Sequence, residues 1–367
     1  MGQSEALWEP WILTRRATRE NWKDISYVRL ATDVGSFPKG TVGLADRIVY
    51  GYPKIPRIEV LEKGLRTHFT HPFWVEEKVD GYNVRVVCWE GELLALTRGG
   101  FVCPFTTDRA GDWIDREIFR EIPDVVLCGE VVGPDNPYVI STSPLVERDA
   151  RFFLFDVMRM GSQEFVPHEL KQELARRFGI DLVPLYGQWT TEDIPRIREI
   201  IVELNRKARE GVIFKEAGGR SLRAKYVTAS SDLSDIAAMG ERFYDVHPSY
   251  FTSRILRLVL FLSEIGGANP LELETELGRA LVRGYGKAVK EFLKHGQCGD
   301  EFRCRFRNPE NAERLIQHLH KVEGEKSRTL VRELKQEGDF WVLRFYKVYS
   351  ATTDLLRNLW EGLLRFD

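Results

Sequence analysis

The stretch VEEKVDGYN, residues 75–83, sets Lys78 between two carboxylates and places an Asp-Gly pair directly after them. Asp-Gly is a common turn dipeptide, and Lys and Glu are common on solvated strand faces, so one interpretation is a strand that ends in a turn. The other interpretation is a lysine held at the mouth of a pocket as a nucleophile. The pattern Lys-x-Asp-Gly is too short to separate the two, so the companions of Lys78 must be sought elsewhere in the chain.

Composition indicates a globular protein without a bulk charge. The 367 residues are 43% hydrophobic and 29% charged, enough for two or three domains with their own cores. A formal net charge of −2 argues against a protein that coats nucleic acid by overall charge, but it is compatible with a local basic groove. Any nucleic-acid surface is therefore expected to be local.

The sequence lacks the segments that are typical of membrane and secreted proteins. The longest dense apolar run begins at Ile255, and Arg257 and Glu264 interrupt it before it is long enough for a bilayer span. The first residues lack the charged start and apolar block of a secretory signal. Five cysteines form no Cys-x-x-Cys pair, which favours reduced thiols. We expect a cytoplasmic protein with no membrane partner.

Hydrophobic patterning divides the chain into four regions. Between about 68 and 230, short alternating runs such as YNVRVVCW are separated by Gly, Pro and Asp turns, which predicts an α+β domain built on antiparallel sheet. After residue 231 the period changes to that of a helix. A further helix is expected within TRRATRENWKD, residues 14–24. The expected regions are a small N-terminal module at 1–62, a catalytic domain at 63–231, a helical region at 232–296 and a mixed domain at 297–367.

A lysine that attacks phosphorus needs help from its surroundings. Its amine is protonated at neutral pH, and burial, neighbouring cations or a metal-bound substrate must release the lone pair. Arg85 and Lys225 are candidate neighbours of Lys78. If a nucleoside triphosphate is the substrate, the departing pyrophosphate also requires a divalent metal and cationic side chains.

A metal requires carboxylates, and a purine requires an apolar face. Glu130, Asp156 and Glu210 each lie in or beside an expected strand, where acids are disfavoured, although any one of them could equally sit on an open sheet face. Phe155 could face a base or fill the core. Because neighbours on a strand point to opposite faces, Phe155 and Asp156 should share a side only where the strand ends or bulges.

The order of these candidates along the chain is more informative than any one of them. In sequence they are EKVDGYNVR, LTRGG, CGEVVG, FFLFD, EGVIFK and RAKYVT, spread over residues 77–228. This series resembles the motifs of the covalent nucleotidyltransferases, which include ATP-dependent ligases and capping enzymes. Together with GYPKIPRI at 51–58 and the helical region, it most resembles the archaeal homodimeric ATP-dependent RNA ligases. The resemblance implies an antiparallel-sheet, ATP-grasp-like ligase domain.

The resemblance also implies a role for each motif residue. Lys78, Asp80 and Lys225 would be catalytic, with Lys78 forming a phosphoamide with AMP and Lys225 meeting the α-phosphate. The implied ATP-binding residues are Glu77, Val79, Gly81, Arg85, Arg98, Glu130, Phe155, Glu210, Lys215 and Arg223. Among them, Arg98 would contact ribose or phosphate, Glu130 the ribose hydroxyls and Phe155 the adenine. The implied metal ligands are Glu210 and Asp156.

One position departs from the family pattern. The last motif usually carries Lys-x-Lys, and Arg223 stands in place of the first lysine. A guanidinium binds phosphate well but cannot act as a proton acid near neutral pH, which puts the role of this position in doubt.

The implied reaction has three steps and uses ATP with Mg²⁺ or Mn²⁺ to join or circularise single-stranded RNA that carries 5′-phosphate and 3′-hydroxyl ends. Lysyl-AMP forms, AMP passes to the RNA 5′-phosphate, and the 3′-hydroxyl displaces it. An ATP-dependent DNA ligase or a capping-type guanylyltransferase would use the same lysine, but both usually carry an OB-fold where residues 232–294 read as helices. An inactive RNA-binding module that keeps the fold is the remaining alternative.

Two hypotheses concern partners. Basic stretches at 196–225 and at Arg303, Arg305 and Arg307 could track RNA, although the second stretch could instead protect an edge strand. The helix expected at 249–265 is apolar on nearly every side, which fits burial either within one chain or in a homodimer. The family resemblance favours the homodimer, with residues 232–296 as the dimerisation domain.

Overall fold

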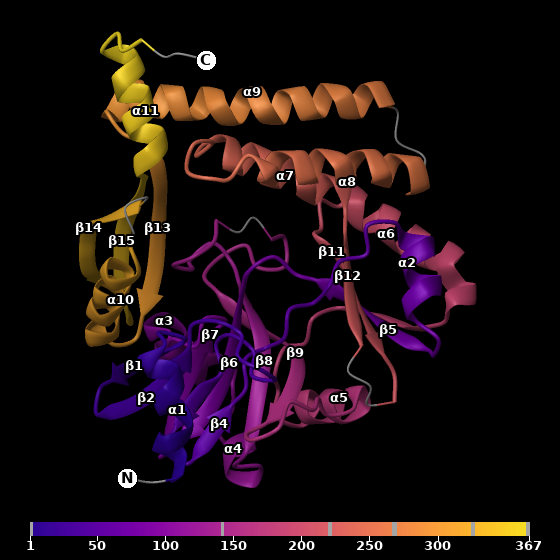
Figure 1. Ribbon diagram of the computed structural model, residues 1–367, viewed down its shortest axis with the longest axis vertical. Coiled ribbons are helices and arrows are strands. Elements are labelled where there is room, and N and C mark those ends of the chain that lie inside the picture. Colours follow the sequence, from indigo (N-terminus) through magenta and orange to yellow (C-terminus); the bar gives the residue numbers. More distant parts are fainter. Residues whose placement is uncertain (1–2, 141–142, 219–221, 266–269, 324–326, 365–367) are drawn as a thin grey trace.

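The computed structural model describes residues 3–140, 143–218, 222–265, 270–323 and 327–364. It contains four sheets in which all neighbouring strands are antiparallel (Figure 1). This confirms the predicted α+β class with antiparallel sheet and a largely helical region after the catalytic domain. None of the described helices is long and apolar enough to span a membrane.

Two four-stranded sheets form the domain that is expected to be catalytic, and we call them the catalytic sheets. The first has the order β10 (Leu185–Trp189), β5 (Phe73–Lys78), β11 (Gly211–Glu216), β12 (Arg223–Val227). The second has the order β7 (Glu92–Thr97), β6 (Tyr82–Trp89), β8 (Val125–Val132), β9 (Arg151–Arg159). The strands β5 and β6 are adjacent in sequence but belong to different sheets, so the Asp80-Gly81 turn carries the chain from one sheet to the other.

Helices cover these sheets and build two cores. The helices of the catalytic domain are α2 (Leu61–His68), α3 (Pro104–Trp113), α4 (Glu117–Glu121), α5 (His168–Arg177) and α6 (Ile194–Arg206), with a short turn η1 (Thr191–Asp193) before α6. One core joins the β5 sheet to α2 and α6 through buried residues such as Phe73, Leu65 and Ile201. The second core fills the β6 sheet and continues into the C-terminal domain.

The N-terminal module is a small antiparallel sheet preceded by a helix. Its elements are α1 (Gln3–Leu13), β1 (Ala17–Trp22), β2 (Ile25–Leu30), β3 (Val42–Leu44) and β4 (Arg47–Val49). The predicted helix at 14–24 is wrong, because this stretch forms β1 and pairs with β2 in register from Ala17 with Leu30 to Trp22 with Ile25. Hairpin pairing with β2 overrides the local helical pattern there.

The region after β12 is helical, as the change of period predicts. It contains α7 (Ala229–Gly240), α8 (Ser249–Ile265) and α9 (Pro270–His295). One side of α8 packs on the core of the β5 sheet, where Leu258 and Phe261 are buried, while Leu256 and Val259 are exposed on its other side. Burial within the chain therefore explains one face of α8 and leaves the second face in solvent.

The C-terminal domain returns to a sheet. Its elements are β13 (Gly299–Phe306), α10 (Pro309–Val322), β14 (Ser327–Glu337), β15 (Phe340–Tyr349) and α11 (Ser350–Trp360), with β13 at a sheet edge. Buried Phe306 and Leu315 of this domain share the core that contains Phe105 of α3. The domain is thus packed against the catalytic domain rather than tethered to it.

Candidate active site

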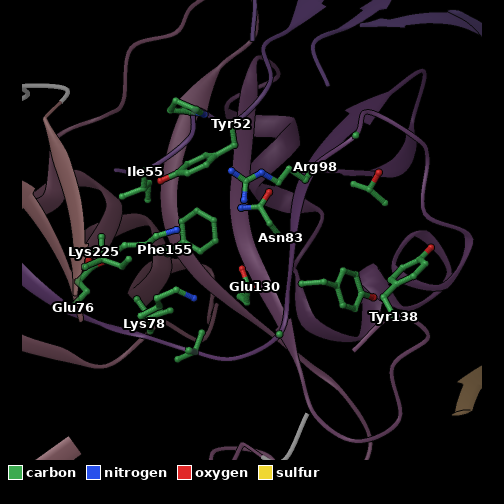
Figure 2. A pocket seen from close by; sticks show the side chains of 18 of the residues that line it. Tyr52, Ile55, Glu76, Lys78, Asn83, Arg98, Glu130, Tyr138, Phe155 and Lys225 are labelled. Atoms are coloured by element: carbon green, nitrogen blue, oxygen red, sulfur yellow. The ribbon is translucent and has the colours of Figure 1, made fainter. Parts of the chain in front are cut away.

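Lys78 ends β5 at the edge of a pocket of about 600 Å³ that lies between the two catalytic sheets (Figure 2). Its Nζ lies 2.5 Å from Oε1 of Glu210, the residue just before β11. The register pairs Lys78 with Gly211, whose φ is +151° and whose missing Cβ would stand 2.1 Å from the Tyr226 carbonyl oxygen. Only glycine fits there, and it lets β12 pack closely against the start of β11, the strand that pairs with Lys78.

The turn after the lysine is fixed by a second glycine. A Cβ on Gly81 would stand 2.3 Å from the carbonyl oxygen of Val131 in β8. The backbone of the turn therefore lies directly against the second sheet. VEEKVDGYN is thus a strand that ends in a turn, and Lys78 at the end of that strand lies at a pocket mouth, where a nucleophile was expected.

The opposite wall comes from the β6 sheet and the segments that follow it. Arg98, directly after β7, and Glu130, in β8, line the pocket together with Asn83 of β6 and Tyr138 (Figure 2). Asn83 and Glu130 are neighbours across the β6–β8 pair. The pocket thus carries polar groups on one wall and the lysine on the other.

Phe155 reaches the pocket because β9 bulges at this residue. Along the β8–β9 ladder, Cys128 faces Asp156 and Gly129 faces Leu154, so Phe155 is the extra residue. Its ring lines the pocket and meets Tyr52 edge-on at 5.1 Å between centroids. This bulge provides the exception that strand alternation requires, and it places an aromatic face beside Lys78.

The buried acids around Lys78 repel one another and hold their protons more strongly than free carboxyl groups do. Burial, followed by the effects of Glu210 and other acids, raises the pKa of Glu130 to about 8 and that of Asp80 to about 7, although Lys78 opposes both shifts. Burial lowers the pKa of Lys78, but Glu210 and Glu130 outweigh burial and raise it. Without a ligand the lysine is therefore held protonated, in contrast to the expected release of its lone pair by burial or cations.

Lys225 has the opposite surroundings. Burial, followed by Arg57, Lys78 and Arg98, lowers its pKa to about 8. Its strand β12 also bridges to Arg57 of the GYPKIPRI segment, and the backbone N–H of Ile58 donates to the Lys225 carbonyl at 2.9 Å. These cations gather at the same mouth as Lys78, where an anionic ligand would neutralise them.

The acids fit a divalent metal held jointly with substrate. Oε2 of Glu210 is buried and has no hydrogen-bond partner among the described residues, and Glu130 and Asp80 have raised pKa values. Across the described ranges, no three acidic, histidine or cysteine side chains converge into a metal centre by themselves. Mg²⁺ commonly binds through one or two carboxylates and completes its shell with phosphate oxygens and water, which suits this arrangement.

The structure places four expected site residues away from the pocket interior or turns their side chains from it. Arg85 is fully buried and donates to the carbonyl oxygens of Tyr50, Gly40 and Thr97, so it is a backbone clamp rather than a neighbour of the lysine. The backbone of Glu77 borders the pocket, but its carboxylate is bound by Arg209 and by the Tyr186 hydroxyl on the other face of β5.

Asp156 and Arg223 form an ion pair behind the pocket. Arg223 donates from Nη2 to Oδ1 of Asp156 at 3.1 Å, and Tyr52 donates to Oδ2 at 2.6 Å. Burial raises the pKa of Asp156, but Lys215 and Arg223 outweigh it and hold the pKa well below its usual range. The assignment of Asp156 as a metal ligand is therefore corrected, because its oxygens are already bound by cations on the side away from Lys78.

Some pocket residues lay outside the expected set. Val79, Gly81 and Lys215 line the pocket as expected, but Glu76, two residues before the nucleophile and on the same strand face, lines it too. Period-two alternation from Lys78 is the signal that could have identified Glu76. His318 and Val322 of α10 also line the pocket, and no local pattern predicts that a distant domain completes it.

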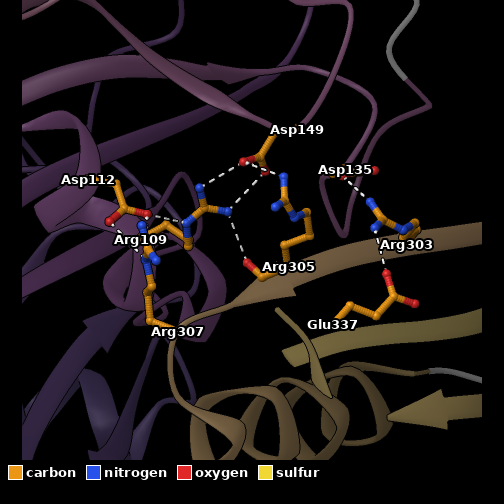
Figure 3. Close-up of polar contacts among 8 residues, drawn as sticks. All are labelled: Arg109, Asp112, Asp135, Asp149, Arg303, Arg305, Arg307 and Glu337. Carbon is orange, nitrogen blue, oxygen red and sulfur yellow. Dashed lines mark hydrogen bonds and ion pairs between the residues drawn. The ribbon is translucent and has the colours of Figure 1, made fainter. Parts of the chain in front are cut away.

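An arginine seam docks this C-terminal domain beside the pocket (Figure 3). We use this name for four arginines, Arg109 of α3 with Arg303, Arg305 and Arg307 at β13, and their acidic partners Asp112, Asp135 and Asp149. Figure 3 shows Asp149 between Arg109 and Arg305, both of which donate to it. The arginines at β13 are thus engaged within the chain, which supports edge protection and docking over an RNA track.

The basic stretch at 196–225 is largely paired as well. Arg198 contacts Glu62, Arg206 contacts Glu203, and Arg209 contacts Glu77. Arg206 keeps 73% of its side chain exposed in such a pair, so contact of this stretch with RNA stays a prediction.

Two family models match the chain in order. Residues 71–227, which contain both catalytic sheets, match the RNA ligase family. Residues 240–363 match the family described as ligase Pab1020 C-terminal region. An uncharacterized protein of Methanocaldococcus jannaschii is 27% identical over 364 residues, which is 96% of this chain and 92% of that protein.

The whole fold is similar to two kinds of solved ligase. A protein of Aquifex aeolicus that has been proposed to be an ATP-dependent DNA ligase is 41% identical, with a TM-score of 0.95, over 99% of this chain and 100% of that one. An archaeal ATP-dependent RNA ligase in two forms is 27% and 28% identical, with TM-scores of 0.90 and 0.91, over the full length of both chains. Because these similarities span the catalytic sheets, the helices and the C-terminal domain alike, the chain belongs to the ATP-dependent RNA ligase family with a Pab1020-type C-terminal region.

Proposed function

We propose that this ligase joins or circularises single-stranded RNA through a covalent lysyl-AMP on Lys78. The observation that carries the proposal is the lysine at the pocket mouth, 2.5 Å from Glu210 and facing a wall that contains Phe155, Glu130 and Arg98. An aromatic face beside a nucleophile and a polar wall suits a nucleotide with its α-phosphate toward the amine.

In the first step, Lys78 Nζ bonds to the α-phosphorus of ATP while the bond from that phosphorus to pyrophosphate breaks. Glu210 is placed to accept the ammonium proton, and Lys225 and Arg98 to balance charge on the phosphates. Glu130, Asp80 and Glu210 would hold Mg²⁺ or Mn²⁺, which screens the clustered phosphates when bound. AMP then moves to the RNA 5′-phosphate, and the 3′-hydroxyl displaces AMP to form the phosphodiester.

Labelling with nucleotide tests the first step. The purified protein is incubated with ATP or GTP labelled at the α-phosphate, with Mg²⁺ or Mn²⁺, and resolved on a denaturing gel. We expect ATP alone to label the protein. Labelling by GTP would favour a guanylyltransferase, and no labelling with either nucleotide would favour an inactive RNA-binding module.

The nucleic acid requires a separate assay, because the similar Aquifex protein has been proposed to be a DNA ligase. A 5′-phosphorylated RNA, its DNA counterpart and a nicked duplex are each incubated with ATP and scored for circles or sealed strands. We expect circles from the RNA. The match of residues 71–227 to the RNA ligase family supports this expectation, whereas the helices α7, α8 and α9 speak only against an OB-fold enzyme, since the Aquifex protein shares the whole fold.

We also propose that the protein is a homodimer that pairs through α9. Figure 1 shows α9 along one border of the molecule, with α7 and α8 on one side of it. Leu271, Val282 and Leu293 are 67%, 73% and 55% exposed, and each step between them is close to three helical turns, so they share one side. Such an exposed apolar stripe on a long helix is a feature of interfaces.

Charge along α9 favours an antiparallel pairing. Exposed Glu272 and Glu276 lie near its beginning, and exposed Lys290 and Lys294 near its end. A two-fold axis near Val282 would place the glutamates of one copy beside the lysines of the other.

Sedimentation tests the dimer. At micromolar concentration we expect twice the chain mass of 42.5 kDa for the wild type, and the monomer mass for Val282→Arg. Val202→Arg, at an exposed position of α6, is the matched control and should remain dimeric. A wild type that sediments as a monomer would refute the dimer.

A further inference from the structure

A chain of five buried charges lies directly behind the nucleotide pocket. Its members are Lys171 of α5, Glu76 of β5, Lys215 of β11, Asp156 of β9 and Arg223 of β12, all less than a tenth exposed. The contacts run in alternating sign from Lys171 to Glu76, from Glu76 to Lys215 at 2.6 Å, from Lys215 to Asp156 at 3.2 Å and from Asp156 to Arg223 at 3.1 Å. This chain joins both catalytic sheets and α5.

The carbonyl oxygen of Phe155 is the point on which this charge chain converges. It accepts a hydrogen bond from Lys171 Nζ at 3.0 Å and another from Lys215 Nζ at 2.6 Å. Phe155 is the bulged residue of β9, so its carbonyl lies outside the regular β8–β9 ladder. Two ammonium donors therefore replace the ladder in fixing this residue.

Lys171 differs from the other members in its position. Lys215 lines the pocket and pairs with both carboxylates, so its removal would break the chain at its centre. Lys171 does not line the pocket, comes from a helix outside the six motifs, and is 2% exposed. Burying a charged lysine to this degree costs free energy of folding. Here the lysine donates hydrogen bonds to two acceptors next to the pocket, Glu76 and the Phe155 carbonyl.

We propose that Lys171 is a positioning residue that fixes Phe155 for the nucleobase of ATP. It acts through the Phe155 carbonyl and Glu76, and it sets how tightly the aromatic face is held against the base. The inference rests on the proposed adenylation of Lys78 and adds to it a residue that determines ATP affinity without touching ATP.

The balance of charge makes this proposal testable. The chain holds three cations and two carboxylates, and the neighbouring His168 is neutral because burial, followed by Lys171, lowers its pKa to about 4. Lys171→Met removes the excess cation and leaves two ion pairs, Lys215 with Glu76 and Arg223 with Asp156. The variant therefore leaves no uncompensated buried charge, which favours a folded protein.

The experiment measures lysyl-AMP formation in a single turnover over a range of ATP concentrations. For Lys171→Met we expect the half-saturating ATP concentration to rise about tenfold, the loss of one charge-assisted hydrogen bond, with the maximal rate within about twofold. The preference for ATP over GTP should fall as well. Arg176→Met, at an exposed position of the same helix, is the matched control and should match the wild type in both quantities.

Each outcome decides between roles. An unchanged half-saturating concentration, or a lower maximal rate at unchanged half-saturation, would overturn the proposal. If Lys171→Met does not fold, Lys171→Gln, which keeps a donor but no charge, is measured by the same criteria, and failure of both variants to fold would assign Lys171 to the fold alone. Absence of adduct in the wild type would instead refute the proposed function.

Discussion

The acids around Lys78 and the arginine seam at β13 are both crowded with charge, but their balance differs. In the seam, Asp149 is bound by Arg109 and Arg305, and Asp112 by Arg109 and Arg307, so each of these two carboxylates meets two guanidinium groups, and Asp135 meets that of Arg303. Around Lys78, three acids surround one lysine and two of them have raised pKa values. The seam is complete within the chain, whereas the pocket is completed by a ligand.

The largest effect is expected at the pocket. Lys78→Ala should abolish the covalent AMP adduct, because no other amine can take the same position against the α-phosphate. Lys78→Arg should also fail, since a guanidinium stays protonated and is not a nucleophile. The measurement is labelling with ATP on a denaturing gel, and undiminished labelling of either variant would contradict the mechanism.

The next effect belongs to the seam and concerns stability. The Arg109 side chain is 4% exposed, donates to Asp112, Asp149 and the Arg305 carbonyl, and lies over the Phe340 ring at 4.8 Å. Arg109→Met should lower the free energy of unfolding by about 2–4 kcal/mol, because it removes a buried guanidinium that binds two partly buried carboxylates and the Arg305 carbonyl, and leaves Asp149 and Asp112 with one arginine each. Urea denaturation of wild type and variant measures the difference.

A decrease in the free energy of unfolding of less than about 1 kcal/mol for Arg109→Met would mean that its ion pairs stabilise the protein no more than exposed surface pairs do. Its half-buried neighbour on the same helix, Asp108, is unsuitable as a control because it accepts hydrogen bonds from the backbone N–H groups of Arg307 and Asn308. Arg116→Met, at an exposed position before α4, is the better control and should leave stability unchanged.

The sequence predicted the pocket better than its surroundings, for a physical reason. Strand alternation and turn dipeptides are local, so β5, β6, β8, β9, β11 and β12 lie close to where their patterns place them. The bulge that turns Phe155 into the pocket depends on the partner strand β8, and only the structure reveals it. Arg85 and Asp156 were misplaced because a charged residue on a strand gives no sign of which buried partners it will meet.

Contacts between distant segments were also beyond prediction. Lys171 lies on a helix with no motif, and its partners in β5 and β9 are far from it in sequence. The Arg303–Arg307 run was compatible with edge protection or with RNA contact. Its acidic partners, Asp112, Asp135 and Asp149, could not be identified from the sequence pattern alone. Local periodicity gives the elements, but pairing of charges is decided by the tertiary fold.

A moderate effect is expected from pH at the pocket. The pKa of Glu130 is raised from 4.5 to about 8, so the folded protein holds a proton that the unfolded chain releases, and the stability contributed by this group is lost as pH rises from about 4.5 through 8. Without nucleotide or metal, Glu130→Gln should therefore raise the melting temperature at pH 8.5 by at least about 2 °C relative to wild type, with a smaller gain at pH 5.

The measurement for Glu130→Gln is thermal unfolding at both pH values, with Glu301→Gln at an exposed position of β13 as control. Equal shifts for Glu130→Gln at pH 5 and pH 8.5 would mean that its carboxylate is already ionised in the folded protein. Glu130 would then lack the raised pKa on which the contrast between the pocket and the seam rests.

The smallest effect is expected at the exposed end of the seam. Arg307 is 46% exposed at its side chain and pairs with Asp112, which Arg109 also binds. Arg307→Gln should lower the free energy of unfolding by less than about 1 kcal/mol, as the loss of an exposed ion pair does.

The same variant tests contact with RNA. Since the Arg307 guanidinium is engaged within the chain, Arg307→Gln should bind RNA as tightly as wild type at low salt, measured by fluorescence anisotropy. A several-fold loss of RNA affinity with unchanged stability would show that β13 contacts RNA after all, because losing a phosphate contact weakens binding without touching the fold. In that case the seam arginines would leave their acidic partners to bind RNA phosphates. The seam, like the pocket, would then be completed by a ligand.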